Sequence, residues 1–163
     1  MWMYVLTDWL GLIPVFVCLF FAAMGFRQMI KRGSLFKVDG DILLLGLYYV
    51  LIFSAYILFE TFPLNYRPVL IEGRMEASFP SSTTLLVLGV MPSLSFQAEQ
   101  RLRNGKTVKI FCAVFSSAMV VLRLMSGVHW LSDIVASVFL GGGLFYIYKA
   151  AALLSRRKCE ELS

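Results

Sequence analysis

Charged residues are scarce in this chain. Of its 163 residues only 15% are charged, whereas a soluble domain carries about 25%. Hydrophobic residues make up 59%, and the mean hydropathy is +0.77. The length allows a single domain, residues 1–163. Because long apolar runs are separated by short charged loops, the composition argues against an ordinary soluble enzyme and predicts a polytopic membrane protein.

Potential metal ligands are also few. The three cysteines, Cys18, Cys112 and Cys159, fit neither the spacing of a zinc site nor a Cys-x-x-Cys redox pair, so we interpret them as small apolar residues. The chain has one histidine, and no carboxylates cluster beside it. Such a set of ligands is too poor for a metal. We therefore expect neither a metal nor another cofactor.

Five apolar runs predict five transmembrane helices and an all-α membrane bundle. They occupy residues 9–26, 42–59, 81–98, 108–124 and 130–154. The third run opens on Ser-Ser-Thr-Thr, a sequence typical of a helix N-terminus. We find no internal repeat and no low-complexity segment.

The basic residues are divided unequally between the two predicted sides. Twelve of the fifteen Lys and Arg residues fall on one side, in 27–41, 99–109 and 155–163 and at Lys149. The other side holds only Arg67, Arg74 and Arg123. By the positive-inside rule, the N-terminus is outside and the C-terminus is cytoplasmic. We expect a multi-pass protein of the plasma membrane, and the charges are topology signals, not a nucleic-acid surface.

The stretch from Arg123 to Asp133 places polar chemistry between two apolar runs. It contains the only histidine, His129. A charged group at mid-depth in a membrane costs about 2.5–3.5 kcal/mol, so such residues are candidates for function. In a helix, His129 and Asp133 would share one face. The carboxylate would then accept a proton from one ring nitrogen, leaving the other as a nucleophile or base.

A second polar stretch, residues 60–84, is predicted at the same membrane face. Arg67 and Arg74 offer guanidinium groups suited to phosphate oxygens. The helix start at residues 81–84 offers free N–H groups and the positive end of a helix dipole. Together with Arg123 and His129, these groups predict a phosphate pocket with a nucleophile.

Each feature also has a structural interpretation. A histidine four residues before an aspartate often forms a structural hydrogen bond, and the serine-threonine start could be only a helix cap. Arg67 could anchor its loop, and Arg74 could pair with Glu72 or Glu76. The joint occurrence of these features on one face favours function.

In this order the residues resemble the type 2 phosphatidic acid phosphatase family, the lipid phosphate phosphatases related to vanadium haloperoxidases. The family motifs are Lys-x6-Arg-Pro, Pro-Ser-Gly-His and Ser-Arg-x5-His-x3-Asp. They read here as Glu60-x6-Arg67-Pro68, Pro80-Ser81-Ser82-Thr83 and Leu122-Arg123-x5-His129-x3-Asp133. The resemblance spans about residues 42–154, and its third motif is the most specific.

The resemblance implies a metal-independent phosphatase that acts on lipid phosphates or diphosphates, often outside the cytoplasm. His129 would form a phosphohistidine, and Asp133 would orient it. The groups implied to hold the phosphate are Arg67, Arg123 and the helix start at Ser81 and Ser82.

Two departures from the motifs change the expected chemistry. The family lysine is Glu60 here, and the histidine that protonates the leaving group is Thr83. Loss of a general acid costs about 10²–10⁴ in rate. Since a phosphate leaving group needs protonation less than an alkoxide does, we expect a preference for a lipid diphosphate, such as a polyprenyl diphosphate.

Three further expectations follow from the same departures. Glu60 or Glu76 could act as a substitute acid, and Arg74 could replace the charge of the missing lysine. The alternative to catalysis is a non-catalytic relative that binds a lipid phosphate, or a partner subunit of a membrane complex.

Overall fold

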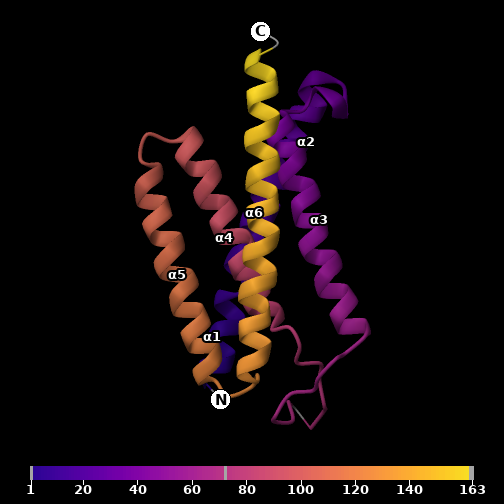
Figure 1. The fold of residues 1–163 in the computed structure, drawn as a ribbon, viewed down its shortest axis with the longest axis vertical. Helices are drawn as coiled ribbons and strands as arrows, with labels where there is room; N and C mark the ends of the chain where they lie inside the picture. The colour runs from indigo at the N-terminus through magenta and orange to yellow at the C-terminus, as the bar shows by residue number, and fades with distance from the viewer. Residues whose placement is uncertain (1, 72, 162–163) are drawn as a thin grey trace.

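The computed structural model describes residues 2–71 and 73–161 and is an all-α bundle, as predicted (Figure 1). A short 3₁₀ helix, η1 (Leu35–Lys37), joins α2 to α3. The α-helices are α1 (Trp2–Leu10), α2 (Leu12–Arg32), α3 (Gly40–Thr61), α4 (Ser82–Arg101), α5 (Gly105–Met125) and α6 (Leu131–Glu161). Within the described residues, the only β-type pairings are two isolated bridges in the α3–α4 connection.

The first predicted helix differs most from its expected bounds. It begins near the start of the chain and is interrupted at Gly11, so that α1 and α2 follow one another. Its basic end, predicted as a loop, continues as helix to Arg32 because Gln, Met, Lys and Arg are good helix formers. The helix stops at Gly33, whose φ of 70° is left-handed and favours glycine.

Four segments are long and apolar enough to cross a membrane. They are α1 with α2, α3, α5 and α6. The remaining long helix, α4, is less apolar, but eleven of its 20 residues are buried. It packs against α5 and α6 and also contacts α2 and α3, so it lies at the centre of the bundle.

Close approach and buried hydrogen bonds hold α4 in place. A Cβ atom on Gly89 would lie 2.5 Å from Cδ1 of Ile52 in α3, so a larger residue would force the Ile52 side chain to shift. Beside it, the Tyr48 hydroxyl donates to the Gly89 carbonyl at 2.8 Å, and Tyr49 and Ser93 hydroxyls are 3.0 Å apart. Interhelical hydrogen bonds of this kind contribute about 0.6–2 kcal/mol each in a membrane.

Two cysteines behave as the sequence predicts. Cys18 and Cys112 are free thiols buried among apolar side chains. The side chain of Cys159 lies outside the described part of the chain.

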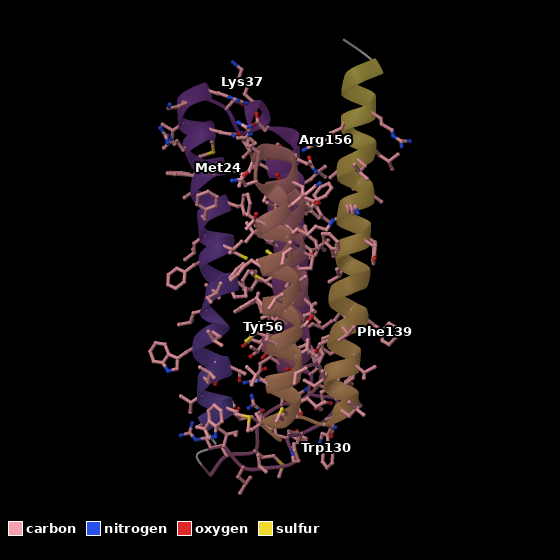
Figure 2. All side chains as sticks on the ribbon, turned by 90° about the vertical axis from the view of Figure 1, so that its left-hand side faces the viewer. Met24, Lys37, Tyr56, Trp130, Phe139 and Arg156 are labelled. Atoms are coloured by element: carbon pink, nitrogen blue, oxygen red, sulfur yellow. The ribbon has the colours of Figure 1, made fainter. Side chains whose placement is uncertain are left out.

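The two candidate stretches meet at one end of the bundle. Figure 1 shows the N-terminus, the α3–α4 connection and the α5–α6 connection together at that end, with the C-terminus at the opposite end. In Figure 2, Trp130 marks the first end, and Lys37 and Arg156 mark the other. At that other end, Arg101 and Arg156 both pair with Asp41. The shared location of the candidate stretches is therefore confirmed.

Candidate phosphate site

His129 is fixed by a backbone carbonyl. It lies in the turn between α5 and α6, and its side chain is 1% exposed. Its Nδ1 is 3.0 Å from the carbonyl oxygen of Ser78. Because a carbonyl can only accept, Nδ1 carries the proton and Nε2 carries the lone pair. Nε2 is buried and has no hydrogen-bond partner in the described part of the protein, so it is free for a ligand.

Asp133 lies close to the imidazole but does not accept the predicted hydrogen bond from it. Helix α6 begins at Leu131, so His129 precedes the helix and does not share a face of it with Asp133. The distance from Nδ1 to Oδ2 of Asp133 is 3.7 Å, too long for a hydrogen bond. Instead, Oδ2 accepts the Ser78 hydroxyl and the Trp130 N–H, the latter at 2.9 Å. Asp133 therefore caps α6 and supports His129 through Ser78.

The surroundings of His129 keep it neutral. Burial, followed by the positive charges of Arg123 and Arg67, lowers the pKa of His129 to about 4. Asp133 and the Ser78 carbonyl act in the opposite direction but are weaker. At neutral pH the ring therefore presents an unprotonated Nε2, the form required of a nucleophile.

Two predicted arginines flank one aromatic ring. The guanidinium carbons of Arg67 and Arg123 lie 5.7 Å and 5.1 Å from the ring centroid of Tyr4 in α1. Arg67 pairs with Glu76 through Nη2 at 3.1 Å, and its Nε donates to the Ala77 carbonyl. Its Nη1 is buried without a partner among the described residues. Arg67 is thus both anchored to its loop and open to a ligand.

Arg123 is held by residues that the sequence analysis missed. Its Nη1 donates to Oγ1 of Thr7 at 2.9 Å and to Oδ1 of Asp8 at 2.7 Å. Its Nε is buried and unpartnered within the described chain. Asp8 was detectable only as a lone carboxylate at the predicted outer end of the first helix, and nothing in the sequence pairs it with a residue 115 positions away.

The two serines at the start of α4, Ser81 and Ser82, have different surroundings. Ser81 is fully buried; its N–H donates to the Asp133 carbonyl at 3.3 Å, and its hydroxyl is 3.0 Å from that of Thr84. Ser137 donates to the Ser81 carbonyl at 3.0 Å. Ser81 therefore joins α4 to α6, and its backbone N–H is not free to hold a phosphate as predicted. Ser82, by contrast, faces open space.

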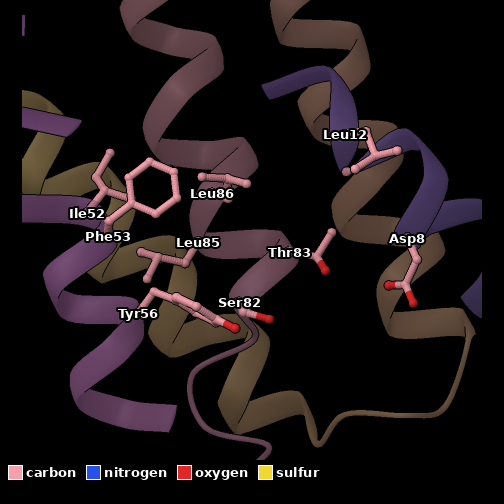
Figure 3. A pocket seen from close by; sticks show the side chains of 10 residues that line it. Asp8, Leu12, Ile52, Phe53, Tyr56, Ser82, Thr83, Leu85 and Leu86 are labelled. Carbon is pink, nitrogen blue, oxygen red and sulfur yellow. The ribbon is translucent and has the colours of Figure 1, made fainter. Parts of the chain in front are cut away.

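Two cavities adjoin this helix start. One of about 230 Å³ is lined by Asp8, Ser82 and Thr83 and by apolar side chains of α3 and α4 (Figure 3). A much narrower one, of about 10 Å³, lies between Ser82, Glu60 and His129. Ser82, Tyr56 and Leu85 line both cavities, and the narrow one reaches His129.

Of the remaining candidates that the structure describes, one lines a cavity with the histidine and two do not. Glu60 lines the narrow cavity together with His129. Glu76 is engaged by Arg67 and not by Arg74. Arg74 is exposed in the α3–α4 connection, where its backbone pairs with Ile71, and the structure shows no contact between it and the described site residues. Glu72, the other suggested partner of Arg74, lies outside the described residues.

The arrangement fits an anion beside a nucleophile. Three buried nitrogens have no partner in the described chain: Nη1 of Arg67, Nε of Arg123 and Nε2 of His129. Two are cationic donors suited to phosphate oxygens, and the third carries a lone pair suited to attack phosphorus, so the set of groups suits a phosphate ester. Among the described residues, no three His, Cys, Asp or Glu side chains are grouped to bind a metal.

Comparison with known proteins gives two matches. The family model of the PAP2 superfamily matches residues 12–156. The crystal structure of a transmembrane PAP2-type phosphatidylglycerolphosphate phosphatase from Bacillus subtilis is similar in fold, with a TM-score of 0.61 and 20% sequence identity, over 87% of this chain and 76% of that one. No curated protein sequence matches the chain.

Proposed function

The chain belongs to the PAP2 superfamily, and we propose that it is a membrane phosphatase that hydrolyses lipid phosphates through a phosphohistidine at His129. The observation that carries this proposal is the state of the imidazole: Nδ1 is bound by the Ser78 carbonyl, and Nε2 is buried and unpartnered among the described residues. The adjacent apolar cavity, which opens among helices of a membrane bundle, supports a lipid substrate.

The reaction has two steps. Nε2 of His129 attacks phosphorus, and the bond from phosphorus to the leaving oxygen breaks as the new N–P bond forms. The leaving oxygen takes up a proton. Water then attacks the phosphohistidine, which releases inorganic phosphate and returns the lone pair to Nε2. Arg67 and Arg123 stabilise the charge on the non-bridging oxygens in both steps.

Proton supply sets the substrate preference. Thr83 occupies the position of the family's general acid and cannot protonate an alkoxide efficiently. We therefore propose a lipid diphosphate, such as a polyprenyl diphosphate, as the preferred substrate, because phosphate leaves with little need of a proton. Glu60 is the better candidate for a substitute acid, since it lines the cavity with His129 while Glu76 is engaged by Arg67.

We also propose that the site faces away from the cytoplasm, in the plasma membrane. The end of the bundle that holds His129 is poor in basic residues, and the opposite end carries the basic clusters around Asp39 and Asp41. The positive-inside rule favours the basic end in the cytoplasm.

The alternative is a protein that binds a lipid phosphate without turning it over. The replacement of the general acid by Thr83 favours it. Both functions need the arginines, but only catalysis needs the lone pair of His129.

Phosphate release separates the two functions. Purified protein in detergent is given a phosphatidate, a phosphatidylglycerolphosphate and a polyprenyl diphosphate. We expect release from the diphosphate to be fastest and His129→Ala to abolish it. Brief incubation with ³²P-labelled substrate should label the wild type but not His129→Ala. Binding without release or labelling would refute catalysis, and faster phosphatidate turnover would refute the diphosphate preference.

A further inference from the structure

The N-terminal helix α1 contributes polar side chains to the site although it lies outside the region that matches the family. The family match begins at residue 12, after α1 ends at Leu10. Nevertheless, Thr7 is fully buried, and the carboxylate of Asp8 lines the larger cavity (Figure 3). Both residues contact Arg123, which the family motif places at the phosphate.

The contacts of Thr7 have a definite direction. Its hydroxyl donates to the Tyr4 carbonyl at 2.8 Å, so only its lone pairs remain for the Arg123 guanidinium. Asp8 adds a charged acceptor at 2.7 Å on the same nitrogen, Nη1. The Tyr4 ring lies against the guanidinium as well, with its centroid 5.1 Å from the central carbon. One helix therefore determines the position of Nη1 and of the guanidinium plane.

The nitrogen of Arg123 that Thr7 and Asp8 bind determines which edge of the guanidinium is left for a ligand. A guanidinium can bind a phosphate in bidentate fashion through two N–H groups on one edge. Since Thr7 and Asp8 both use Nη1, the edge formed by Nε and Nη2 is left for a ligand, and Nε is the buried atom that lacks a partner in the described chain. If Asp8 simply occupied the phosphate position, it would be expected on that free edge.

The junction between α1 and α2 keeps this helix close to the site. A Cβ atom on Gly11 would lie 3.1 Å from Cγ2 of Thr83, so a larger residue would press against the start of α4. The Gly11 N–H also donates to the Thr7 carbonyl at 2.9 Å. The turn thus places Thr7 and Asp8 beside α5, with which α1 is packed.

We propose that Thr7 and Asp8 are positioning residues that hold Arg123 by Nη1 and present its Nε–Nη2 edge to the substrate phosphate. This inference rests on the proposed phosphate site but not on turnover. It assigns to α1 a role in substrate binding that the family motifs do not include.

The test measures binding of inorganic phosphate by calorimetry in detergent, for the full chain. Asp8→Ala should raise the dissociation constant about tenfold or more, which corresponds to about 1.4 kcal/mol. Asp8→Asn, which keeps an acceptor oxygen, should raise it less. Thr7→Val should weaken binding a few-fold, and Thr7→Ser should restore it. Where turnover occurs, KM should rise in parallel.

A matched control is available at the other end of the bundle. Asp39 pairs with Arg32 at 2.7 Å, the same distance as Asp8 to Arg123, and Asp39→Asn should leave phosphate binding unchanged. Thermal unfolding of each variant in detergent shows whether it is folded. If Asp8→Ala is not folded, binding to Asp8→Asn is the test. Arg123→Gln should abolish binding.

Opposite results would overturn the inference. Tighter phosphate binding in Asp8→Asn would show that Asp8 competes with the substrate, and unchanged binding would show that it does not position Arg123. Absence of binding in the wild type would remove the anion site itself. Weakened binding in the variants without turnover in any protein would leave the inference standing and refute the proposed catalysis.

Discussion

The carbonyl oxygen of Ser78 lies 3.0 Å from Nδ1 of His129, closer than any oxygen of Asp133. The Ser78 hydroxyl, in turn, donates to Asp133. Orientation of the histidine thus depends on the backbone of one loop, and the carboxylate acts through that loop and through the Trp130 N–H. This order of contacts separates the effects of three substitutions.

We expect Asp133→Ala to destabilise the protein more than Ser78→Ala does. Removal of the carboxylate leaves the Ser78 hydroxyl and the Trp130 N–H without an acceptor, at about 1–3 kcal/mol for each buried donor. Ser78→Ala keeps the carbonyl that binds His129 and loses one hydrogen bond to a charged group, at about 1.5–3 kcal/mol. Asp133→Asn, which keeps one acceptor, should fall between them. Thermal unfolding in detergent ranks the three, and equal losses for the two alanine variants would contradict this account.

The titration of His129 provides a second prediction. Because the chain has one histidine, ¹⁵N-histidine labelling gives a single imidazole in an NMR spectrum of protein without a histidine tag. We expect its midpoint near pH 4 and not near 6.5. Arg67→Gln removes a positive charge that lowers the pKa, so the midpoint should rise.

Asp133→Asn is a control that should shift the His129 titration in the opposite direction. The carboxylate raises the pKa of His129, so its neutralisation should lower the midpoint further. A wild-type midpoint near 6.5, or a fall in Arg67→Gln, would show that burial and the two arginines do not keep the ring neutral.

Hydropathy predicted the helices well because a membrane imposes long apolar runs on the sequence. The same reasoning placed Arg67 and His129 at one end of the bundle, since alternate connections of a helical bundle lie on the same side. Helix ends were predicted less well: α2 and α6 continue beyond the apolar runs into basic residues, which form helix readily outside the hydrocarbon.

The residues that hold the site could not be predicted. Ser78 and Asp8 contact the third motif across 51 and 115 positions of sequence, and neither stands in a recognisable pattern. The predicted His129–Asp133 hydrogen bond was wrong. The prediction assumed that His129 lies in the same helix as Asp133, but α6 begins two residues after His129, at Leu131. Spacing therefore identifies a candidate nucleophile, and tertiary contacts determine how it is oriented.

A third prediction concerns Glu60 and Glu76. If Glu60 supplies the proton, Glu60→Gln should slow phosphatidate turnover by about 10²-fold and diphosphate turnover much less, because phosphate leaves without strong protonation. Glu76→Gln should change KM and not the ratio between the substrates, since Glu76 contacts Arg67. The measurement is the initial rate on each substrate. An unchanged ratio of the phosphatidate rate to the diphosphate rate in Glu60→Gln would exclude Glu60 as the acid.

The orientation in the membrane gives a fourth prediction. Met75, in the α3–α4 connection, and Leu35, in η1, are both exposed. The α3–α4 connection and η1 lie at opposite ends of the bundle. In a variant without native cysteines, Met75→Cys should react with a membrane-impermeant maleimide in intact cells. Leu35→Cys should react only after the cells are opened. The reverse pattern would place the site in the cytoplasm.

The fifth prediction restores the missing acid. Thr83 lines the cavity of about 230 Å³ beside Ser82, so there is space for an imidazole directed into it (Figure 3). Thr83→His should therefore raise phosphatidate turnover by about 10²-fold or more, with a smaller gain on a diphosphate. The gain should disappear as pH rises above the pKa of the introduced imidazole, because only its protonated form donates.

Thr83→Gln is the matched control, since it fills similar space and cannot act as an acid. Equal gains in Thr83→His and Thr83→Gln would trace the effect to the shape of the cavity instead of to proton transfer. No gain in a Thr83→His protein that is folded and still binds phosphate would mean that the departing oxygen is not next to this position. The acid would then have to come from the side of His129 on which Glu60 lies.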